Sequence, residues 1–176
     1  MEDLLRYAHC TGEIPMLGEY DVFVAGAGPA GVAAAETAAR FGHSVILVEK
    51  NGFPGGQAVA GLSATICGLY LTNEEWTRKN GPVQIAHGFI DRFKKNMIER
   101  GGLTEPQLYG NTYVDTHEPF VWKCVAEDML TDAGVTILYH TTITDVVKEG
   151  DTIQEVIVFT AAGYRRIRAK RFIDAS

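Results

Sequence analysis

Uninterrupted apolar runs flank a helical pattern near the start of the chain. Asp21–Ala25 (DVFVA) and Ser44–Glu49 (SVILVE) contain few polar residues. Such runs are typical of parallel strands that are buried on both faces of a sheet. Between them, Val32–Phe41 is rich in alanine, and Gly42 stands where a helix would end. The pattern predicts a strand–helix–strand unit of roughly 30 residues.

The middle of the chain has a weaker periodicity. Residues 50–80 are rich in glycine and are expected to form loops. Over Pro82–Arg100 the apolar residues recur at helical spacing, so we expect a helix that includes His87. Residues 103–118 show no clear period, whereas Pro119 is well placed to begin a further helix that Gly134 ends.

The last part of the chain returns to strands. Val135–Tyr139 is a third buried run, residues 143–168 alternate between strand-like segments and turns, and Arg171–Ala175 is a last short strand. The fold class that these elements predict is α/β. We expect a three-layer Rossmann-type domain with a parallel sheet, one face of which is covered by an antiparallel β-meander built from residues 143–168.

A glycine-rich turn joins the first strand to the first helix. It reads GAGPAG, with Gly26, Gly28 and Gly31 in GxGxxG spacing and Pro29 and Ala30 between them. The first glycine permits a tight turn, the second lets the backbone approach a pyrophosphate, and the third lets the helix pack close to the sheet. The helix N-terminus adds unpaired N–H groups and a partial positive charge. These features predict a dinucleotide at this turn.

The residues after the second strand extend this expected site and distinguish two cofactors. Glu49, which follows Gly26 by 23 residues, is placed to accept hydrogen bonds from an adenosine ribose, and Lys50 follows it. Shortly afterwards, Gly55 and Gly56 can bring backbone N–H groups to the pyrophosphate and ribityl part of FAD.

Two further residues, Gln57 and Ala58, directly follow the paired glycines and are expected to line the same channel. A nicotinamide dehydrogenase would usually continue into another crossover helix at this point. We therefore favour FAD as the cofactor and keep an NAD(P)-binding domain as an alternative.

The sequence resembles the N-terminal portion of FAD-dependent oxidoreductases related to fumarate reductase and glutathione reductase. The resemblance is carried by Tyr20–Leu62, His117–Val147 and Ile167–Ser176. It implies that the segment after the third strand contacts adenine near Ile143, and that Ala175 belongs to the cofactor site. In the family, the last strand continues into Ala-Thr-Gly and an aspartate-bearing flavin motif, so a second FAD contact is expected beyond the printed sequence.

The expected domain organisation follows from this resemblance. Residues 1–19 would be an N-terminal extension and residues 20–176 an incomplete FAD-binding domain, with residues 50–118 inserted on the cofactor and substrate side. The expected function is the FAD-binding portion of a flavin-dependent oxidoreductase, which transfers electrons or hydride on a small-molecule substrate. The alternative is a noncatalytic nucleotide-binding subunit, or a fragment that needs a partner chain. A bare sheet edge would favour such a complementary chain or self-association.

Composition limits the partners, metals and cellular compartments that can be expected for this protein. A formal net charge of −6 disfavours nucleic acid as a partner. The 3 cysteines are far apart and form no metal-binding or dithiol motif, which is typical of a reducing compartment. The first 20 residues lack the pattern of a secretory signal, and the weakly polar stretch Ala58–Leu71 is too short to span a bilayer. We therefore expect a cytoplasmic protein with no membrane partner and no metal, and the sequence identifies no catalytic residue.

Overall fold

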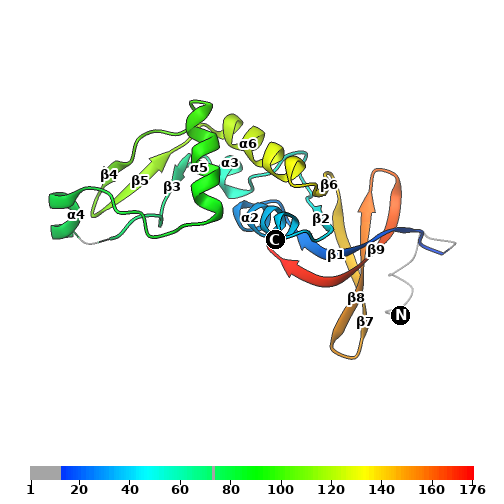
Figure 1. Cartoon of the computed structure of the whole chain (residues 1–176). Coiled ribbons are helices and arrows are strands. Elements are labelled where there is room, and N and C mark those ends of the chain that lie inside the picture. Colours follow the sequence, from blue (N-terminus) through cyan, green and yellow to red (C-terminus); the bar gives the residue numbers. More distant parts are fainter. Residues whose placement is uncertain (1–12, 73) are drawn as a thin grey trace.

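A computed structural model of the chain describes residues 13–72 and 74–176 (Figure 1). A six-stranded sheet has the order β6-β2-β1-β9-β8-β7, and a smaller three-stranded sheet has the order β3-β5-β4. The elements are β1 (Met16–Ala25), α2 (Pro29–Arg40), β2 (Val45–Val48), α3 (Gln57–Ala60), β3 (Thr65–Ile66), α4 (Glu74–Asn80), α5 (Phe89–Glu99), β4 (Gln107–Tyr109), β5 (Thr112–Thr116), α6 (Pro119–Asp132), β6 (Thr136–Leu138), β7 (Thr142–Glu149), β8 (Thr152–Thr160) and β9 (Gly163–Asp174).

The parallel part of the large sheet is the predicted Rossmann core. Strand β1 pairs in parallel with β2 on one side and with β9 on the other, and β2 pairs in parallel with β6. All four residues of β2 are buried, as expected for a strand that is covered on both faces. The apolar runs at Asp21–Ala25, Ser44–Glu49 and Val135–Tyr139 are thus confirmed as parallel strands. The ends of β2 and β6 differ from the prediction by one residue, whereas β1 begins five residues earlier than predicted.

The two strands predicted at the end of the chain form a single strand, β9. Its first half pairs antiparallel with β8, and most of its length pairs in parallel with β1. The prediction that the meander over residues 143–168 ends before a separate strand at Arg171–Ala175 is therefore wrong. The residues between them, Ala169 and Lys170, include no glycine or proline, so nothing interrupts the extended backbone.

Two separate clusters of buried side chains lie on the two faces of the sheet. Alternate residues of β1 point to opposite faces, so Val24 joins a cluster with residues of the helices while Phe23 joins a cluster with the meander. In the second cluster, Phe23 and Ile46 pack with Val156 of β8 and Ile167 of β9. The meander therefore covers one face of the parallel strands, and the three-layer α/β architecture is confirmed.

Strand β1 begins inside the segment that we expected to be an N-terminal extension. Met16 pairs with Arg166 and Gly18 with Ile167, with an irregular register between the two pairs. Arg166 also donates to the carbonyl of Ile14. The described part of residues 1–19 therefore lengthens the central strand, whereas residues 1–12 lie outside the described residues.

The segment predicted as one helix over Pro82–Arg100 is helical only in its second half. Gly88 has a φ of +91° and ends the non-helical part, and its N–H donates to the side chain of Asp91 at 2.8 Å. Helix α5 begins directly after Gly88, so His87 lies outside the helix, contrary to prediction. Apolar spacing alone overestimated the helix because glycine with positive φ breaks the helical backbone.

The neighbouring segments are more ordered than predicted. Residues 103–118, expected to be irregular, contain the antiparallel pair β4 and β5, which turns at Gly110 with a φ of +62°. The glycine-rich residues 50–80 contain the short helices α3 and α4 and the short strand β3. We call residues 61–116 the arm, because Figure 1 shows most of these elements extending away from the large sheet.

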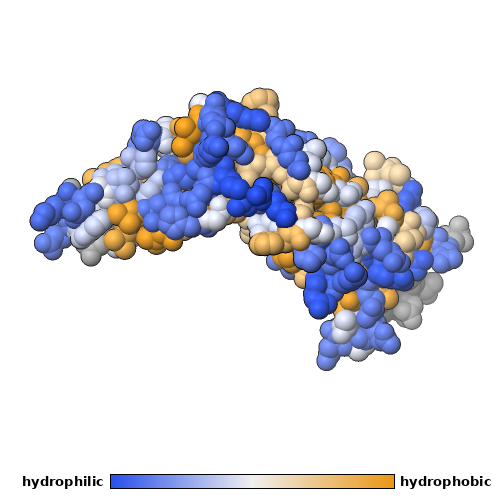
Figure 2. Space-filling view, in the orientation of Figure 1, coloured by the Kyte–Doolittle hydropathy of each residue, from blue (hydrophilic) through white to orange (hydrophobic). Residues whose placement is uncertain are grey.

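An ion pair links the arm to the Rossmann helix. Glu36 of α2 is 2% exposed, and its carboxylate lies 2.7 Å from the Nη2 atom of Arg92 in α5. Figure 2 shows the resulting bent outline, with the arm at one end and the meander near the other. In the described part of the chain, no helix is long and apolar enough to cross a membrane.

Candidate functional site

The glycine turn between β1 and α2 needs two of its glycines for purely internal reasons. Gly26 has a φ of +90°, and a Cβ atom there would lie 2.8 Å from the carbonyl oxygen of Ala175. A Cβ atom on Gly31 would lie 1.8 Å from the carbonyl oxygen of Gly26. Any side chain at either position would therefore push β9 or α2 away from the turn.

The third glycine, Gly28, has no such internal requirement. Its backbone is extended, with a φ of −67° that any residue adopts, and a Cβ atom there would meet no atom within 4 Å. Gly28 is the N-cap of α2, and Pro29 and Ala30 follow it as exposed residues of the first helical turn. The space beside Gly28 is thus open at a helix N-terminus, where backbone N–H groups favour an anion.

Glu49 lies behind this turn and holds it in place. The side chain is 6% exposed, and its Oε2 atom accepts a hydrogen bond of 2.8 Å from the N–H of Ala27. Its Oε1 atom accepts from the backbone and the side-chain nitrogen of Asn51, both at 2.8 Å. A carboxylate offers about four acceptor positions, so these bonds leave capacity for one further donor. The supporting role toward Ala27 was not visible in the sequence.

The paired glycines Gly55 and Gly56 approach the same turn from the other side. The N–H of Gly55 donates to the carbonyl of Ala27 at 2.7 Å, and the φ of Gly55 is +126°. Gly56, with a φ of +46°, would place a Cβ atom 3.1 Å from the Cα atom of Gly28. The structure therefore brings the two glycine segments into contact.

The remaining predicted site residues differ in how near they lie to this contact. Lys50 and Gln57 are exposed, and Ala58 is half-buried in α3. Ala175 lies against the glycine turn, since its N–H donates to the carbonyl of Ala25 at 2.9 Å. Ile143 lies in β7, where it pairs with Val158 and is 37% exposed.

Two residues that are not among the predicted site residues lie beside Glu49. The N–H of Thr141 donates to the carbonyl of Glu49, and the N–H of His140 donates to the carbonyl of Asn51. Both residues follow β6, and ligands of open α/β sheets bind at the carboxyl ends of the parallel strands. Their position directly after a predicted buried strand is the sequence signal that points to them.

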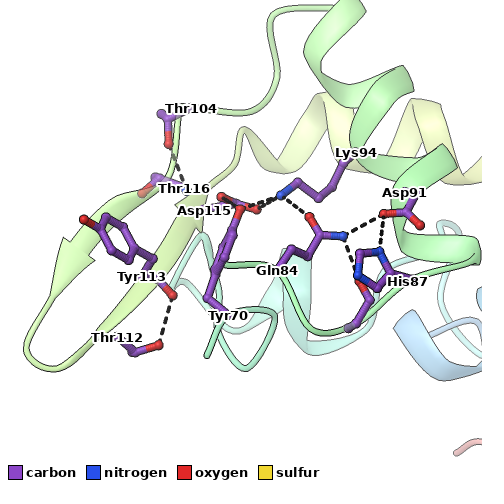
Figure 3. Close-up of polar contacts among 11 residues, drawn as sticks. Tyr70, Gln84, His87, Asp91, Lys94, Thr104, Thr112, Tyr113, Asp115 and Thr116 are labelled. Atoms are coloured by element: carbon purple, nitrogen blue, oxygen red, sulfur yellow. Dashed lines mark hydrogen bonds and ion pairs between the residues drawn. The ribbon is translucent and has the colours of Figure 1, made fainter. Parts of the chain in front are cut away.

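A second polar cluster lies in the arm, away from the glycine turn (Figure 3). The Nζ atom of Lys94 lies 2.8 Å from the Oδ2 atom of Asp115 and also donates to Tyr70 and Gln84. Tyr70 donates to the Oδ1 atom of Asp115 at 2.7 Å, and Asp115 is 0% exposed. The ammonium group thus donates two hydrogen bonds and forms an ion pair with Asp115. The cluster joins α5, β5 and the segment after β3.

The electrostatics of this cluster favour a charged lysine beside a neutral tyrosine. Burial raises the pKa of Tyr70, and the hydrogen bond and charge of Asp115 add to this against the opposing effect of Lys94. Burial lowers the pKa of Lys94, but its hydrogen bonds and charge interactions with Asp115 and Tyr70 outweigh burial, so that the pKa is raised. These residues are far apart in the chain and follow no periodicity, which is why the sequence analysis did not group them.

The comparisons with known proteins concern the family and the fold of the chain. A family model described as FAD dependent oxidoreductase matches residues 21–176. A search of curated proteins found no match to this chain. Solved structures share its fold, although the sequence identities are low enough that they support the fold alone.

Three of these structures illustrate the likeness. Thermovibrio ammonificans THI4 has a TM-score of 0.60 at 20% identity, over 90% of this chain and 57% of that one. A flavocytochrome c3 fumarate reductase has a TM-score of 0.63 at 20% identity, over 99% of this chain and 36% of that one. The 3-ketosteroid-delta4-(5alpha)-dehydrogenase from Rhodococcus jostii RHA1 has a TM-score of 0.59 at 18% identity, over 96% of this chain and 47% of that one. The chain thus spans only part of the length of each.

Proposed function

The chain belongs to the family of FAD dependent oxidoreductases, and on this premise we propose that its two glycine segments hold the ADP half of FAD. The proposed site comprises the glycine turn, the carboxylate behind it, the paired glycines and the ends of the neighbouring strands. Its residues are Gly26, Gly28, Pro29, Ala30, Gly31, Glu49, Lys50, Gly55, Gly56, Gln57, Ala58, Ile143 and Ala175.

The observation that carries this proposal is the open space at Gly28. The fold itself accounts for glycine at positions 26 and 31, because Cβ atoms there would clash with the protein. At position 28 a Cβ atom would meet nothing, and the φ of −67° suits any residue. A ligand that must approach the backbone closely supplies the missing reason for a glycine, and a pyrophosphate is such a ligand at a helix N-terminus.

Each part of the chain has a role in holding this ligand. The first N–H groups of α2 would bind the pyrophosphate, and the remaining acceptor capacity of Glu49 would bind the ribose. Gly56 would close the other side of the turn, since it already lies against Gly28. When bound, FAD supplies the capacity to accept and donate electrons or hydride, while the protein supplies binding and orientation.

The proposal also covers the reaction, the partners and the location of the protein. We propose electron or hydride transfer on a small-molecule substrate, with the arm on the substrate side of the cofactor and either a complementary chain or self-association completing the sheet edge. Nucleic acid and membrane partners are not part of the proposal. We also propose a cytoplasmic location, because the cysteines are few and widely spaced. Fractionation of cells that produce the protein would test this location.

A titration with FAD tests the site directly. The extended backbone at position 28 accepts a β-branched residue, so Gly28→Val should keep the thermal stability of the protein. The valine side chain would fill the open space beside the turn. We expect FAD affinity to fall on the order of 100-fold, equivalent to about 2.8 kcal/mol. Ala161→Val adds the same side chain at an exposed position between β8 and β9 and is the matched control.

The outcome of the titration separates the proposed function from its alternatives. Unchanged FAD affinity in Gly28→Val would show that the cofactor does not lie over this turn. Binding of NAD(P) in preference to FAD would favour the nicotinamide alternative, and a flavin-loaded protein without dye reduction would favour a noncatalytic subunit.

A further inference from the structure

A buried histidine lies beside the segment that follows the paired glycines. His117 is 4% exposed and directly precedes Glu118, the N-cap residue of α6. Its Nε2 atom lies 2.7 Å from the carbonyl oxygen of Ala58 in α3. Since a carbonyl oxygen only accepts hydrogen bonds, Nε2 carries the proton. The Nδ1 atom is buried and has no hydrogen-bond partner within the described residues.

The backbone of His117 holds the other end of the same segment. Its N–H donates to the carbonyl of Ala64 at 2.8 Å. Between the two attachment points, Leu62 has a φ of +62° and is 95% exposed, and Ala64 has a φ of +48°. Such backbone conformations are costly for residues with side chains and persist only where their surroundings hold them. His117 therefore fixes a strained segment, Ala58–Ala64, at both ends.

This segment is connected by a short path to the cofactor site. In α3, the N–H of Ala58 donates to the carbonyl of Gly55 at 3.0 Å, and the N–H of Ala60 donates to the carbonyl of Gly56 at 2.9 Å. Gly56 in turn lies against Gly28. A movement of Ala58 away from His117 would therefore move the paired glycines relative to the glycine turn.

We propose that His117 is a positioning residue for the cofactor, which acts by holding α3 through its Nε2–H group so that Gly55 and Gly56 stay opposite Gly28. The inference rests on the proposed binding of FAD between these glycine segments. An apolar side chain of similar size would fill the same space without burying an unpaired nitrogen, which is itself unfavourable. What the imidazole adds at this position is the hydrogen bond to Ala58.

Three substitutions separate the hydrogen bond from the packing. His117→Gln carries an amide N–H at a distance from the backbone similar to that of Nε2, whereas the amide of His117→Asn is too short and lies nearer the position of Nδ1. His117→Leu fills the space and has no donor. As a control, Glu118→Ala removes the side chain that accepts from Val121 at 2.7 Å and so weakens the N-terminus of the same helix, but it does not touch Ala58–Ala64.

Hydrogen exchange in the protein without added nucleotide is the first measurement. The amides of Ala58–Gly61 are hydrogen-bonded within and just before α3. We expect them to exchange about 10-fold faster in His117→Leu and His117→Asn, because one hydrogen bond that restrains α3 is lost. His117→Gln and Glu118→Ala should match the unmodified protein at these amides. Equal exchange in His117→Leu and the unmodified protein would overturn the inference.

FAD titration is the second measurement. We expect about 5- to 10-fold weaker binding in His117→Leu and His117→Asn, and near-normal binding in His117→Gln. If His117→Gln is impaired as much as His117→Leu, the side chain acts by packing and the inference is wrong. If Gly28→Val loses FAD binding while His117→Leu binds FAD normally, the inference about His117 is wrong but the proposed function is not affected. An unmodified chain that binds no FAD overturns the proposed function as well.

Discussion

The β1–α2–β2 unit and the arm are stabilised in different ways. The unit buries mainly apolar side chains, and its turn is shaped by glycine backbone and held by one carboxylate, that of Glu49. At the centre of the arm, by contrast, a fully buried carboxylate, Asp115, pairs with Lys94 and Tyr70. The stabilisation from apolar burial is roughly proportional to the buried area, whereas the stability of a buried charge depends on the presence of its partner. We therefore expect the arm to respond more strongly to loss of a single polar group.

The largest effect is expected in Lys94→Met. The substitution keeps the length of the side chain but leaves the carboxylate of Asp115 buried without a cation, which costs about 3–5 kcal/mol. Hydrogen exchange measured separately in the arm and in β1 and β2 should show faster opening of the arm while the unit is unaffected.

The double variant Lys94→Met with Asp115→Asn is the control for this prediction. It removes the buried charge together with its partner, so part of the lost stability should return. If the amides of β1 and β2 opened as readily as those of the arm in Lys94→Met, the two regions would form one cooperative unit and the contrast between them would not hold.

A smaller effect is expected in the turn, where Gly31→Ala and Gly28→Ala form a matched pair. The Cβ atom in Gly31→Ala would lie 1.8 Å from the carbonyl oxygen of Gly26, so α2 must shift. We expect a loss of about 1–3 kcal/mol, as in other overpacked sites. Gly28→Ala should change the stability by less than about 0.5 kcal/mol, because its Cβ atom meets no neighbour. Urea unfolding without nucleotide measures both, and a similar loss in the two variants would contradict the assignment of Gly28 to the ligand.

The smallest effect is expected at the start of α5, where the arm joins the core. The N–H of Gly88 donates to Asp91 and, with a contribution from His87, holds the pKa of this carboxyl below its ordinary value, although burial opposes the shift. Because the folded-state pKa is depressed, the stabilisation is fully present above about pH 4, the ordinary pKa of aspartate, and is lost as the pH falls through the folded-state pKa.

Thermal unfolding at neutral and acidic pH checks this expectation. Asp91→Asn should lower the midpoint at neutral pH and make the fall in midpoint upon acidification smaller than in the unmodified protein. Glu149→Gln changes an exposed carboxyl on β7 and shows what loss of one surface charge does. If the thermal midpoint fell equally on acidification in Asp91→Asn and Glu149→Gln, Asp91 would not contribute specifically to the pH dependence of stability.

The sequence predicted the β1–α2–β2 unit well because its signals are local. The run over Val45–Val48, the glycine spacing from Gly26 and the helix end at Gly42 each depend on neighbouring residues, and Gly42 indeed has a φ of +87°. Both glycine segments were assigned to the same ligand, since each carries a recognisable pattern, but their direct contact was not predicted. Whether the predicted site residues bind FAD stays a prediction.

The arm and the support of the site could not be predicted in the same way. The partners Tyr70 and Asp115 are 45 positions apart, and no periodic pattern links such pairs. The apolar spacing before Phe89 is typical of a helix, but Gly88 prevents the helix from extending there. The hairpin of β4 and β5 has too few apolar residues for its strands to be recognised in the sequence. The hydrogen bonds of Glu49 to Ala27 and of His117 to Ala58 depend on the folded arrangement alone.

The pairing of β1 with β9 has a consequence for how the protein is made. Ala25 pairs with Asp174, so the central strand, which pairs early with β2, acquires its second neighbour, β9, only after Asp174 has been synthesised. Ala175, which lies against Gly26, arrives at the same time. Pairings this distant in sequence form slowly, because a long loop must close before they gain any contacts. On the ribosome, the glycine turn therefore reaches its final shape late. If FAD binds at this turn as we propose, it binds only after Ala175 has been synthesised and does not guide the early folding of β1 and α2.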